Sequence, residues 1–276
     1  MMGELQRIIG LITDFGLKDP YVAIMKAVIL NINPNVEIID ISHEIEKFSI
    51  AEASFILTSS LKYFPRDTVF VVVVDPGVGS SRRALIIQTK NFTFIGPDNG
   101  VLVPAAIKDG VKNVYEILNR NFFLKPVSST FHGRDIFAPA AAYLTLGTPP
   151  EILGRKINLN SIVKPSWATF KLSKDKVEGY FVYFNGFGNA STNIPADEVS
   201  WLKYGMRVRV NIHGKASLII KFLRAYSEVE EGETLLVTNS FGFLELAVNK
   251  GSARRKYNLK YGDKVTTSFR THICYL

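Results

Sequence analysis

Acidic residues follow three apolar runs of this chain, each where a predicted buried strand gives way to a glycine-bearing turn. Asp75 follows residues 69–74 and opens a Pro-Gly-Val-Gly-Ser turn, and Asp14 and Asp98 have comparable positions after two other apolar runs. Asp and Gly are also ordinary turn formers, so one such acid carries little information. In open α/β sheets, however, ligands bind outside the carboxyl ends of the strands. Three strand-end acids therefore predict one shared site.

A second group of reactive side chains surrounds His132. Among the four histidines, only His132 has an arginine and an aspartate so close, in the string Thr130-Phe131-His132-Gly133-Arg134-Asp135. The alternative is that Arg134 and Asp135 serve the helix expected at 136–146 and that His132 is incidental. Arg82 follows Asp75 by seven residues, far enough to return to the mouth of that turn. A carboxylate, a guanidinium and an imidazole that converge on a pocket can hold and deprotonate a water molecule.

The first half of the chain supplies elements that would position these groups. Near-continuous apolar strands alternate with helices, which predicts an α/β domain with a mostly parallel sheet buried on both faces. Ser49 and Glu52 are spaced as a capping box that would open the second helix. The strands are expected at 8–13, 36–41, 69–74, 84–88 and 92–95, the last two joined by Lys90-Asn91, and the helices at 20–32 and 49–61.

The pattern changes in the second half, where short alternating strands are separated by glycine-bearing turns. This spacing predicts an all-β barrel or sandwich. We therefore expect an α/β domain over residues 1–167 and a β-barrel domain over 168–276. The expected strands are 177–184, 207–212, 216–222, 234–238, 243–247 and 264–269.

Composition excludes several classes of protein. A 47% hydrophobic content is far from that of disordered chains, and no apolar run approaches the length needed to cross a bilayer. The first residues do not read as a signal peptide, and Cys274 is the only cysteine, so we expect a cytoplasmic protein without a disulfide or a thiolate metal cluster. The net charge of +8 raises the possibility of RNA binding, but the basic residues are dispersed and are not interleaved with aromatic residues. We expect no nucleic-acid or membrane partner.

The second half also carries amide and aromatic side chains suited to a ligand. Asn185, Phe187 and Asn189 lie in one glycine-rich turn, and Ser240 and Phe241 lie in another. Asparagine offers both a donor and an acceptor to the edge of a heterocycle, and aromatic rings offer stacking faces. Each turn alone is a weak signal, because Asn-Gly turns between strands are common.

Six strings taken in order are specific where each alone is not. They span nearly the whole chain, and the sequence resembles the S-adenosylmethionine (SAM) hydroxide adenosyltransferase family, relatives of fluorinating and chlorinating enzymes. The resemblance implies an N-terminal α/β domain, a C-terminal β-barrel and a homotrimer with sites at subunit interfaces. The strings are TDFG (13–16), DPGVGS (75–80), GPDNG (96–100), STFHGRDIFAPAAA (129–142), GFGNASTNI (186–194) and NSFGFLELAVNKGSA (239–253).

The resemblance also implies roles for particular residues. Asp75, Arg82 and His132 would prepare water, and because halogenating relatives replace the positions of Asp75 and His132, hydrolysis of SAM to adenosine and L-methionine is expected. The reaction would need neither a metal nor a cofactor, since SAM is itself the substrate. The implied substrate-binding residues are Asp14 for the ribose, Asn189 with Tyr226 and Phe187 for the adenine, Phe48 and Phe131 as aromatic walls, and Ser240, Phe241 and position 185 for the methionine end.

One residue departs from the family pattern. Asn185 stands where relatives carry an acid that pairs with the methionine ammonium. A neutral amide forgoes the charge-assisted part of that hydrogen bond. This leaves open a non-catalytic protein that binds an adenosyl ligand. Two further alternatives are a halogenase-like enzyme and a metal-dependent hydrolase built on Asp14, Asp75, Asp98 and His132.

Overall fold

The structure is a computed structural model that describes residues 7–269. Residues 1–6, for which the sequence predicts no signal peptide, and Cys274 lie outside the described residues. The chain divides into two compact units, Met1–Pro165 and Ser166–Leu276. Among the described residues, no helix has the length and apolar character needed to cross a membrane.

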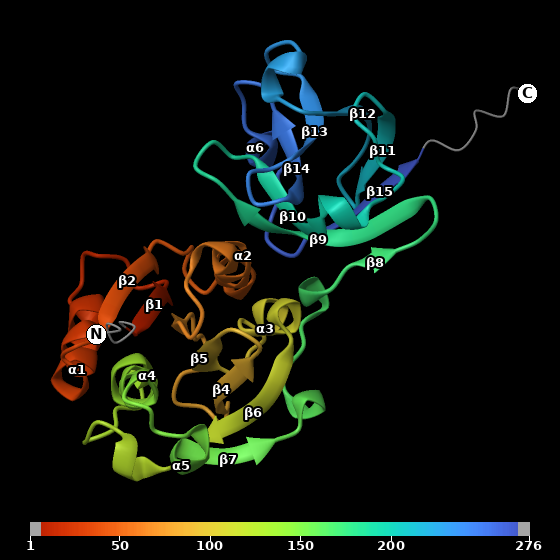
Figure 1. The fold of residues 1–276 in the computed structure, drawn as a ribbon. Coiled ribbons are helices and arrows are strands. Elements are labelled where there is room, and N and C mark those ends of the chain that lie inside the picture. The colour runs from red at the N-terminus through yellow and green to blue at the C-terminus, as the bar shows by residue number, and fades with distance from the viewer. Residues whose placement is uncertain (1–6, 270–276) are drawn as a thin grey trace, which may run out of the picture. The chain divides into compact units, whose positions relative to one another are not determined.

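The first unit contains a seven-stranded mixed sheet in the order β2-β1-β3-β5-β4-β6-β7 (Figure 1). The predicted α/β class is confirmed, but the strands are parallel only from β2 to β5, and the pairs from β5–β4 to β6–β7 are antiparallel. The antiparallel half begins with β4 and β5, the two strands expected to be joined by Lys90-Asn91. The strands are β1 (Ile8–Thr13), β2 (Glu37–Ser42), β3 (Val69–Val73), β4 (Ala84–Thr89), β5 (Thr93–Pro97), β6 (Val111–Ile117) and β7 (Gly154–Ile157).

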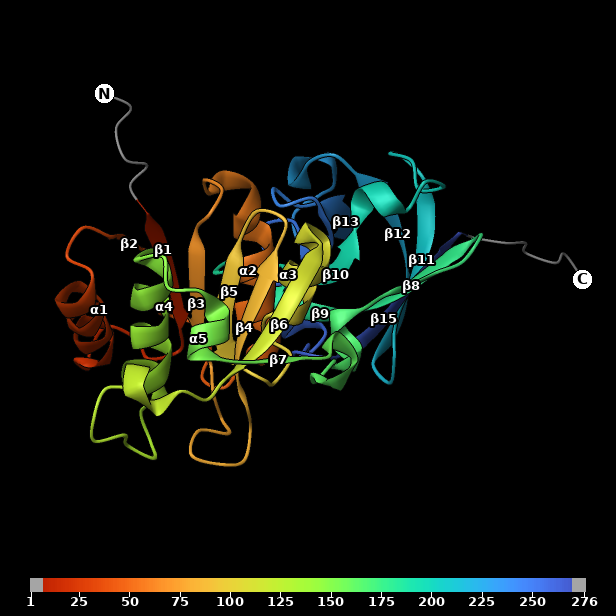
Figure 2. The same cartoon turned by 60° about the horizontal axis from the view of Figure 1, so that its bottom comes forward.

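Helices bury the apolar strands of this sheet. Alternate residues of β1 and β3, including Ile9 and Val71, pack with Met25 and Ile29 of α1 and with α4 in one core (Figure 2). On the other side of β3, Phe70 packs against Phe94 and other rings. The helices are α1 (Tyr21–Ile32), α2 (Ile50–Ser60), α3 (Val103–Asp109), α4 (Ala138–Thr145) and α5 (Pro150–Leu153), with 3₁₀ turns at Leu61–Tyr63, Arg120–Phe122 and Leu159–Ser161 and a π-helical turn at Gly133–Phe137.

The predicted capping box at the start of α2 is wrong. The Ser49 side chain makes no capping hydrogen bond, and the Glu52 carboxylate accepts from the main-chain N–H of Glu46 rather than from Ser49. The chain reaches α2 through Phe48, whose φ of 67° turns it sharply just before Ser49. Ser49 and Glu52 have the spacing of a capping box, but the Glu52 carboxylate bonds the segment before Phe48 instead.

The second unit is a β-barrel, as predicted. Seven strands close through the order β10-β14-β13-β12-β11-β15-β9, with β9 pairing back to β10, while β8 extends from β9. The two valines of β11, Val208 and Val210, are buried and belong to the same core as Phe181 and Leu244. The elements are β8 (Lys171–Leu172), β9 (Lys176–Phe184), β10 (Ala190–Pro195), β11 (Arg207–Ile212), β12 (Ala216–Leu223), β13 (Thr234–Thr238), β14 (Phe243–Val248), β15 (Lys264–Phe269) and α6 (Ala253–Lys256), with 3₁₀ turns at Ser166–Ala168, Ala196–Glu198 and Tyr226–Glu228.

Candidate active site

A cavity of about 260 Å³ opens in the first unit beside the ends of β1 and β3. It brings together five residues predicted from the sequence, although they come from four separate segments. These are Asp14, Phe48, Asp75, Phe131 and His132. The sequence did not single out the remaining lining residues, Phe15, Asp19, Tyr21, Lys47, Val73, Val78, Thr130 and Gly133.

Arg82 joins Asp75 to His132. Its Nε lies 3.0 and 2.9 Å from the two carboxylate oxygens of Asp75, and its Nη2 lies 2.5 Å from Oδ2. The same Nη2 lies 2.8 Å from Nδ1 of His132. Asp75 and His132 line the cavity, whereas Arg82 bonds both without lining it. A largely buried guanidinium therefore fixes the two groups relative to each other.

This contact determines where His132 carries its proton. Guanidinium has no acceptor, so Nδ1 of His132 must accept from Arg82, and the neutral ring carries its hydrogen on Nε2. Burial, and secondly the charge of Arg82, lower the pKa of His132 from its ordinary value of 6.5, against the opposing effects of Asp75 and Asp135. At neutral pH, His132 is therefore an uncharged ring with one N–H donor remaining.

A glycine lets the Asp75 turn approach the segment that carries His132. Gly79 has a φ of 79°, and a Cβ atom built on it would lie 2.3 Å from the main-chain oxygen of Ser129. Both the backbone conformation and the contact therefore require glycine at this position. Arg134 pairs with the fully buried Asp135, whose Oδ2 accepts from the N–H of Ser128. These bonds fix residues 128–135, the segment that Gly79 contacts at Ser129.

Asp14 is fixed by the segment before α2. The N–H of Phe48 donates to Oδ2 of Asp14 over 2.9 Å, and Nζ of Lys47 donates to the main-chain oxygen of Asp14. Asp14 is 6% exposed, and its other carboxylate oxygen has no hydrogen bond within the described residues. A cavity-lining carboxylate with an available oxygen can accept hydroxyl hydrogens from a sugar.

The two predicted aromatic walls differ in their support. Phe131 is 8% exposed and makes edge contacts with Phe15 and Tyr21, at centroid distances of 5.7 and 5.1 Å. Phe48 is 68% exposed even though it lines the cavity. Phe131 is therefore a fixed wall, whereas the ring of Phe48 lies largely in solvent.

The third strand-end acid does not join the site. Asp98 pairs with Arg83, at 2.8 Å from Nε and 2.5 Å from Nη2, and accepts from the N–H of Val163 at 2.8 Å. Asp98 does not line the cavity. Over residues 7–269, no group of three or more His, Cys, Asp or Glu side chains is placed to bind a metal. The prediction of one site for all three acids is wrong, because Asp98 forms an ion pair with Arg83 outside the cavity.

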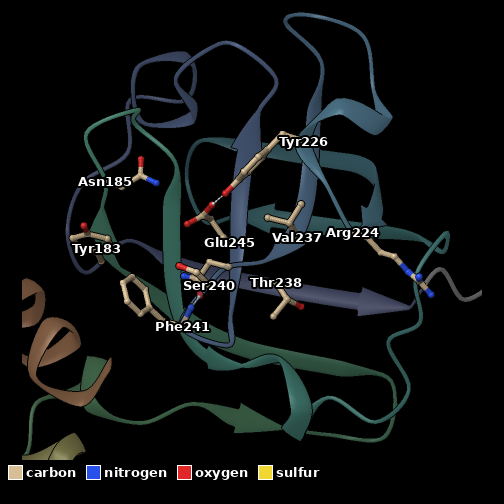
Figure 3. A pocket seen from close by; sticks show the side chains of 10 residues that line it. Tyr183, Asn185, Arg224, Tyr226, Val237, Thr238, Ser240, Phe241 and Glu245 are labelled. Carbon is tan, nitrogen blue, oxygen red and sulfur yellow. Dashed lines mark hydrogen bonds between the residues drawn. The ribbon is translucent and has the colours of Figure 1, made fainter. Parts of the chain in front are cut away.

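A second cavity of about 260 Å³ lies within the barrel unit (Figure 3). Four of the predicted substrate-binding residues line it: Asn185, Tyr226, Ser240 and Phe241. Phe187, which is 82% exposed, and Asn189, which is buried, do not. The lining residues not singled out from the sequence are Tyr183, Arg224, Val237, Thr238, Asn239 and Glu245.

Asn185 organises the turn that follows β9. Its Oδ1 accepts from the N–H of Phe187 at 3.0 Å and from the N–H of Asn189 at 3.1 Å. Both bonds come from backbone donors, which fixes the amide so that its oxygen faces the turn. The other end of the side chain is an NH₂ group, which only donates.

Glu245 of β14 is the residue that the sequence reasoning missed. It is 2% exposed, yet it lines the cavity, and its Oε1 accepts from the Tyr226 hydroxyl at 2.8 Å (Figure 3). Burial, and next the charge of Glu245, raise the pKa of Tyr226 to about 12. A single acid inside the apolar strand Phe243–Val248 was the available signal, since buried acids are rare.

The chain is similar in sequence to proteins of one known family. Residues 9–154 match the model of the SAM hydroxide adenosyltransferase N-terminal domain, and residues 179–266 match that of the C-terminal domain. Proteins named (R)-S-adenosyl-L-methionine hydrolase are similar to this chain. The protein from Methanocaldococcus jannaschii is 36% identical over 96% of this chain and 97% of its own, and that from Thermus thermophilus is 35% identical over 92% and 96%.

A solved structure is also similar. The crystal structure of an uncharacterized conserved protein from Thermotoga maritima has a TM-score of 0.83 and 43% identity, and the match covers 94% of this chain and 99% of that one. The two family models match both units, and the similarity to these relatives extends over nearly the full length. The chain therefore belongs to the SAM hydroxide adenosyltransferase family.

Proposed function

We propose that this protein hydrolyses SAM to adenosine and L-methionine by attack of a water molecule on the 5′ carbon. The observation that carries the proposal is the Asp75–Arg82–His132 cluster, two members of which line the same cavity as Asp14. The relatives named as hydrolases support the same reaction. They also favour it over halogenation.

In this proposal the two cavity-lining members of the cluster have different tasks. Neutral His132 donates from Nε2 to the water oxygen, which orients the water but does not deprotonate it. The Asp75 carboxylate accepts a water proton as the new carbon–oxygen bond forms, an effect typically worth about 10²–10⁴-fold in rate. Arg82 is a positioning residue that keeps Asp75 and His132 at fixed separation.

The leaving group determines what else the reaction requires. Sulfur departs from the 5′ carbon with the bonding electron pair, so a sulfonium becomes a neutral thioether and needs no general acid. The positive charge of SAM disappears in this step, and aromatic faces such as Phe131 can attract that charge before it is lost. We therefore propose that neither a metal nor a cofactor takes part.

The remaining predicted roles belong to the same proposal. Asp14 would bind the ribose, and Phe48 and Phe131 would wall the sugar and sulfonium. Asn189, Tyr226 and Phe187 would hold the adenine, and Ser240 and Phe241 the methionine end. A cytoplasmic homotrimer with its sites at subunit interfaces is proposed from the family resemblance, and the exposed rings of Phe48 and Phe187 are consistent with contact to a neighbouring subunit.

The direct test is incubation of the purified protein with SAM in ¹⁸O-labelled water. Chromatography should find adenosine and L-methionine in equal amounts, and mass spectrometry should find the label in the 5′ hydroxyl of adenosine. Asp75→Asn should abolish turnover and still bind SAM. Bound but unconsumed SAM in the wild-type protein would instead identify an adenosyl-ligand binding protein, and a 5′-halogenated product in the presence of halide would identify a halogenase.

A further inference from the structure

The barrel cavity contains one buried carboxylate, Glu245. Besides the Tyr226 hydroxyl on Oε1, it accepts on Oε2 from the Ser191 hydroxyl at 2.8 Å. Ser191 accepts in turn from Nδ2 of Asn239 at 2.9 Å. Each carboxylate oxygen has two acceptor positions, so each retains one. Glu245 is therefore held in place by neutral donors and can still accept hydrogen bonds.

No cationic side chain within residues 7–269 forms an ion pair with this carboxylate. Among the ion pairs of the described residues, none includes Glu245, although it is almost fully buried. The one arginine that lines the cavity, Arg224, has its guanidinium 5.1 Å from the centre of the Tyr204 ring. Buried ionised carboxylates are costly unless they are paired. A cavity with such a group at its wall is suited to a cationic ligand group.

Asn185 is not suited to that task. Its oxygen is occupied by two backbone N–H groups of its own turn, and its NH₂ group can only donate. An ammonium group is also only a donor, so the two cannot bond. Glu245 is the only carboxylate side chain among the residues that line the cavity.

We propose that Glu245 is the residue that recognises the α-ammonium group at the methionine end of the substrate, in place of the acid that position 185 lacks. This inference rests on the proposed function, because it takes SAM as the ligand. The ammonium would donate to the remaining acceptor positions of Glu245. The contact would distinguish SAM from sulfonium compounds without an amino-acid end.

The test compares two substrates, SAM and the dimethylsulfonium analogue of 5′-deoxyadenosine, which keeps the reacting carbon but has no amino-acid end. Glu245→Gln should lower kcat/KM for SAM about tenfold to hundredfold, the usual worth of a hydrogen bond to a charged group. The value for the analogue should change less than about twofold, because the contact is absent there. Equal losses for both substrates, or no loss for either, would overturn the proposal.

Glu245→Asp separates charge from position. Gln matches Glu in length and can still accept from one of the Tyr226 and Ser191 hydroxyls while its NH₂ group donates to the oxygen of the other. Asp keeps the charge but is one methylene shorter. Recognition of an ammonium predicts that the Asp variant retains more preference for SAM than the Gln variant. A purely structural role predicts the reverse order, and that result would also overturn the proposal. Thermal unfolding identifies a variant that fails to fold, in which case the other variant decides.

The failure of the proposed function has a different signature. If the wild-type protein consumes neither substrate, calorimetric titration with SAM and with the analogue replaces kinetics, and the same order of variants applies to Kd. Loss of SAM affinity in Glu245→Gln would then support ammonium recognition without catalysis. Equal affinity of the wild-type protein for SAM and for the analogue would overturn the proposal that Glu245 recognises the ammonium group.

Discussion

The main-chain N–H of Phe48 donates to Oδ2 of Asp14 over 2.9 Å from a residue with a φ of 67°. A bulky side chain in the left-handed region is a conformational outlier that costs about 1–3 kcal/mol. The strained backbone thus orients a carboxylate of the candidate site. Because the ring of Phe48 is largely exposed, its burial contributes little free energy to offset this strain.

Phe48→Asn should raise the free energy of unfolding by about 1 kcal/mol, because asparagine tolerates this backbone conformation better than phenylalanine. It should also raise KM for SAM, since the aromatic wall is lost. Chemical denaturation and steady-state kinetics measure the two effects. Lys250→Asn is the matched control, because Lys250 has a φ of 50° and does not line either cavity, and it should leave KM unchanged.

Arg82→Lys should lower kcat by about a hundredfold or more, because the shorter lysine has a single nitrogen in place of the planar fork that bonds Asp75 and His132 through Nε and Nη2. Arg83→Lys is the control, since Arg83 pairs with Asp98 outside the cavity. The control variant should retain kcat even if it is less stable. Equal losses of kcat in the two variants would remove Arg82 from the mechanism.

The pH dependence of kcat/KM follows from the lowered pKa of His132. His132 is neutral above its folded pKa, and that pKa lies below 6.5, so activity should persist as pH falls to 6.5 and decline only at lower pH. Stability should follow the same sign, because the unfolded state binds the proton more readily and acid therefore favours unfolding. An acid limb of kcat/KM centred above pH 6.5 would contradict a neutral, Arg82-bound His132.

Gly79→Ala should reduce both stability and kcat, because its Cβ would meet the main-chain oxygen of Ser129 and separate the Asp75 turn from the His132 segment. Gly147→Ala isolates the effect of backbone strain. Gly147 has a φ of 91° but no atom within 4 Å of an added Cβ. We expect each variant to lose about 1 kcal/mol or more from strain, but only Gly79→Ala to lose kcat.

Exhaustive treatment with a chelator should leave turnover unchanged if the sulfonium leaves without metal assistance. Adenosine formation is measured before and after dialysis against EDTA, and again after adding back Mg²⁺, Mn²⁺ or Zn²⁺. Loss of activity that one of these ions restores would replace the proposed water activation by a metal-dependent one.

Local patterns predicted those parts of the fold that depend on local chemistry. The apolar run at β3 gave a strand buried on both faces, and the alternating residues at β11 gave a barrel strand. β10 was not predicted because Ala190–Pro195 is largely polar and lacks an apolar pattern. Its Ser191 and Thr192 are nevertheless buried, and their hydroxyls donate hydrogen bonds to β14. Beyond the β4–β5 pair, the antiparallel half of the first sheet follows from strand pairing over longer sequence separations, which a local pattern does not contain.

The site was predictable where motifs carry the chemistry. Asp75, Arg82 and His132 come together as expected, because the sheet edge and Gly79 bring their segments into contact. The sequence could not show which nitrogen of His132 carries the proton, because that follows from the distance between Nδ1 and Arg82. Nor could it show that Asp98 pairs with Arg83 outside the cavity. Glu245 stood out in the sequence only as an acid inside an apolar strand, and its role required knowledge of its burial and its neighbours.

Closure of the barrel by the β9–β10 pair leaves every one of its seven ring strands bonded on both sides. Residues at the cavity, such as Asn185 and Ser240, project from connections between these strands and take no part in the ring itself. A change of ligand preference can therefore be acquired by altering such connections one at a time, with the cooperative unit beneath them intact. A substitution at position 185, in the turn after β9, is a change of this kind.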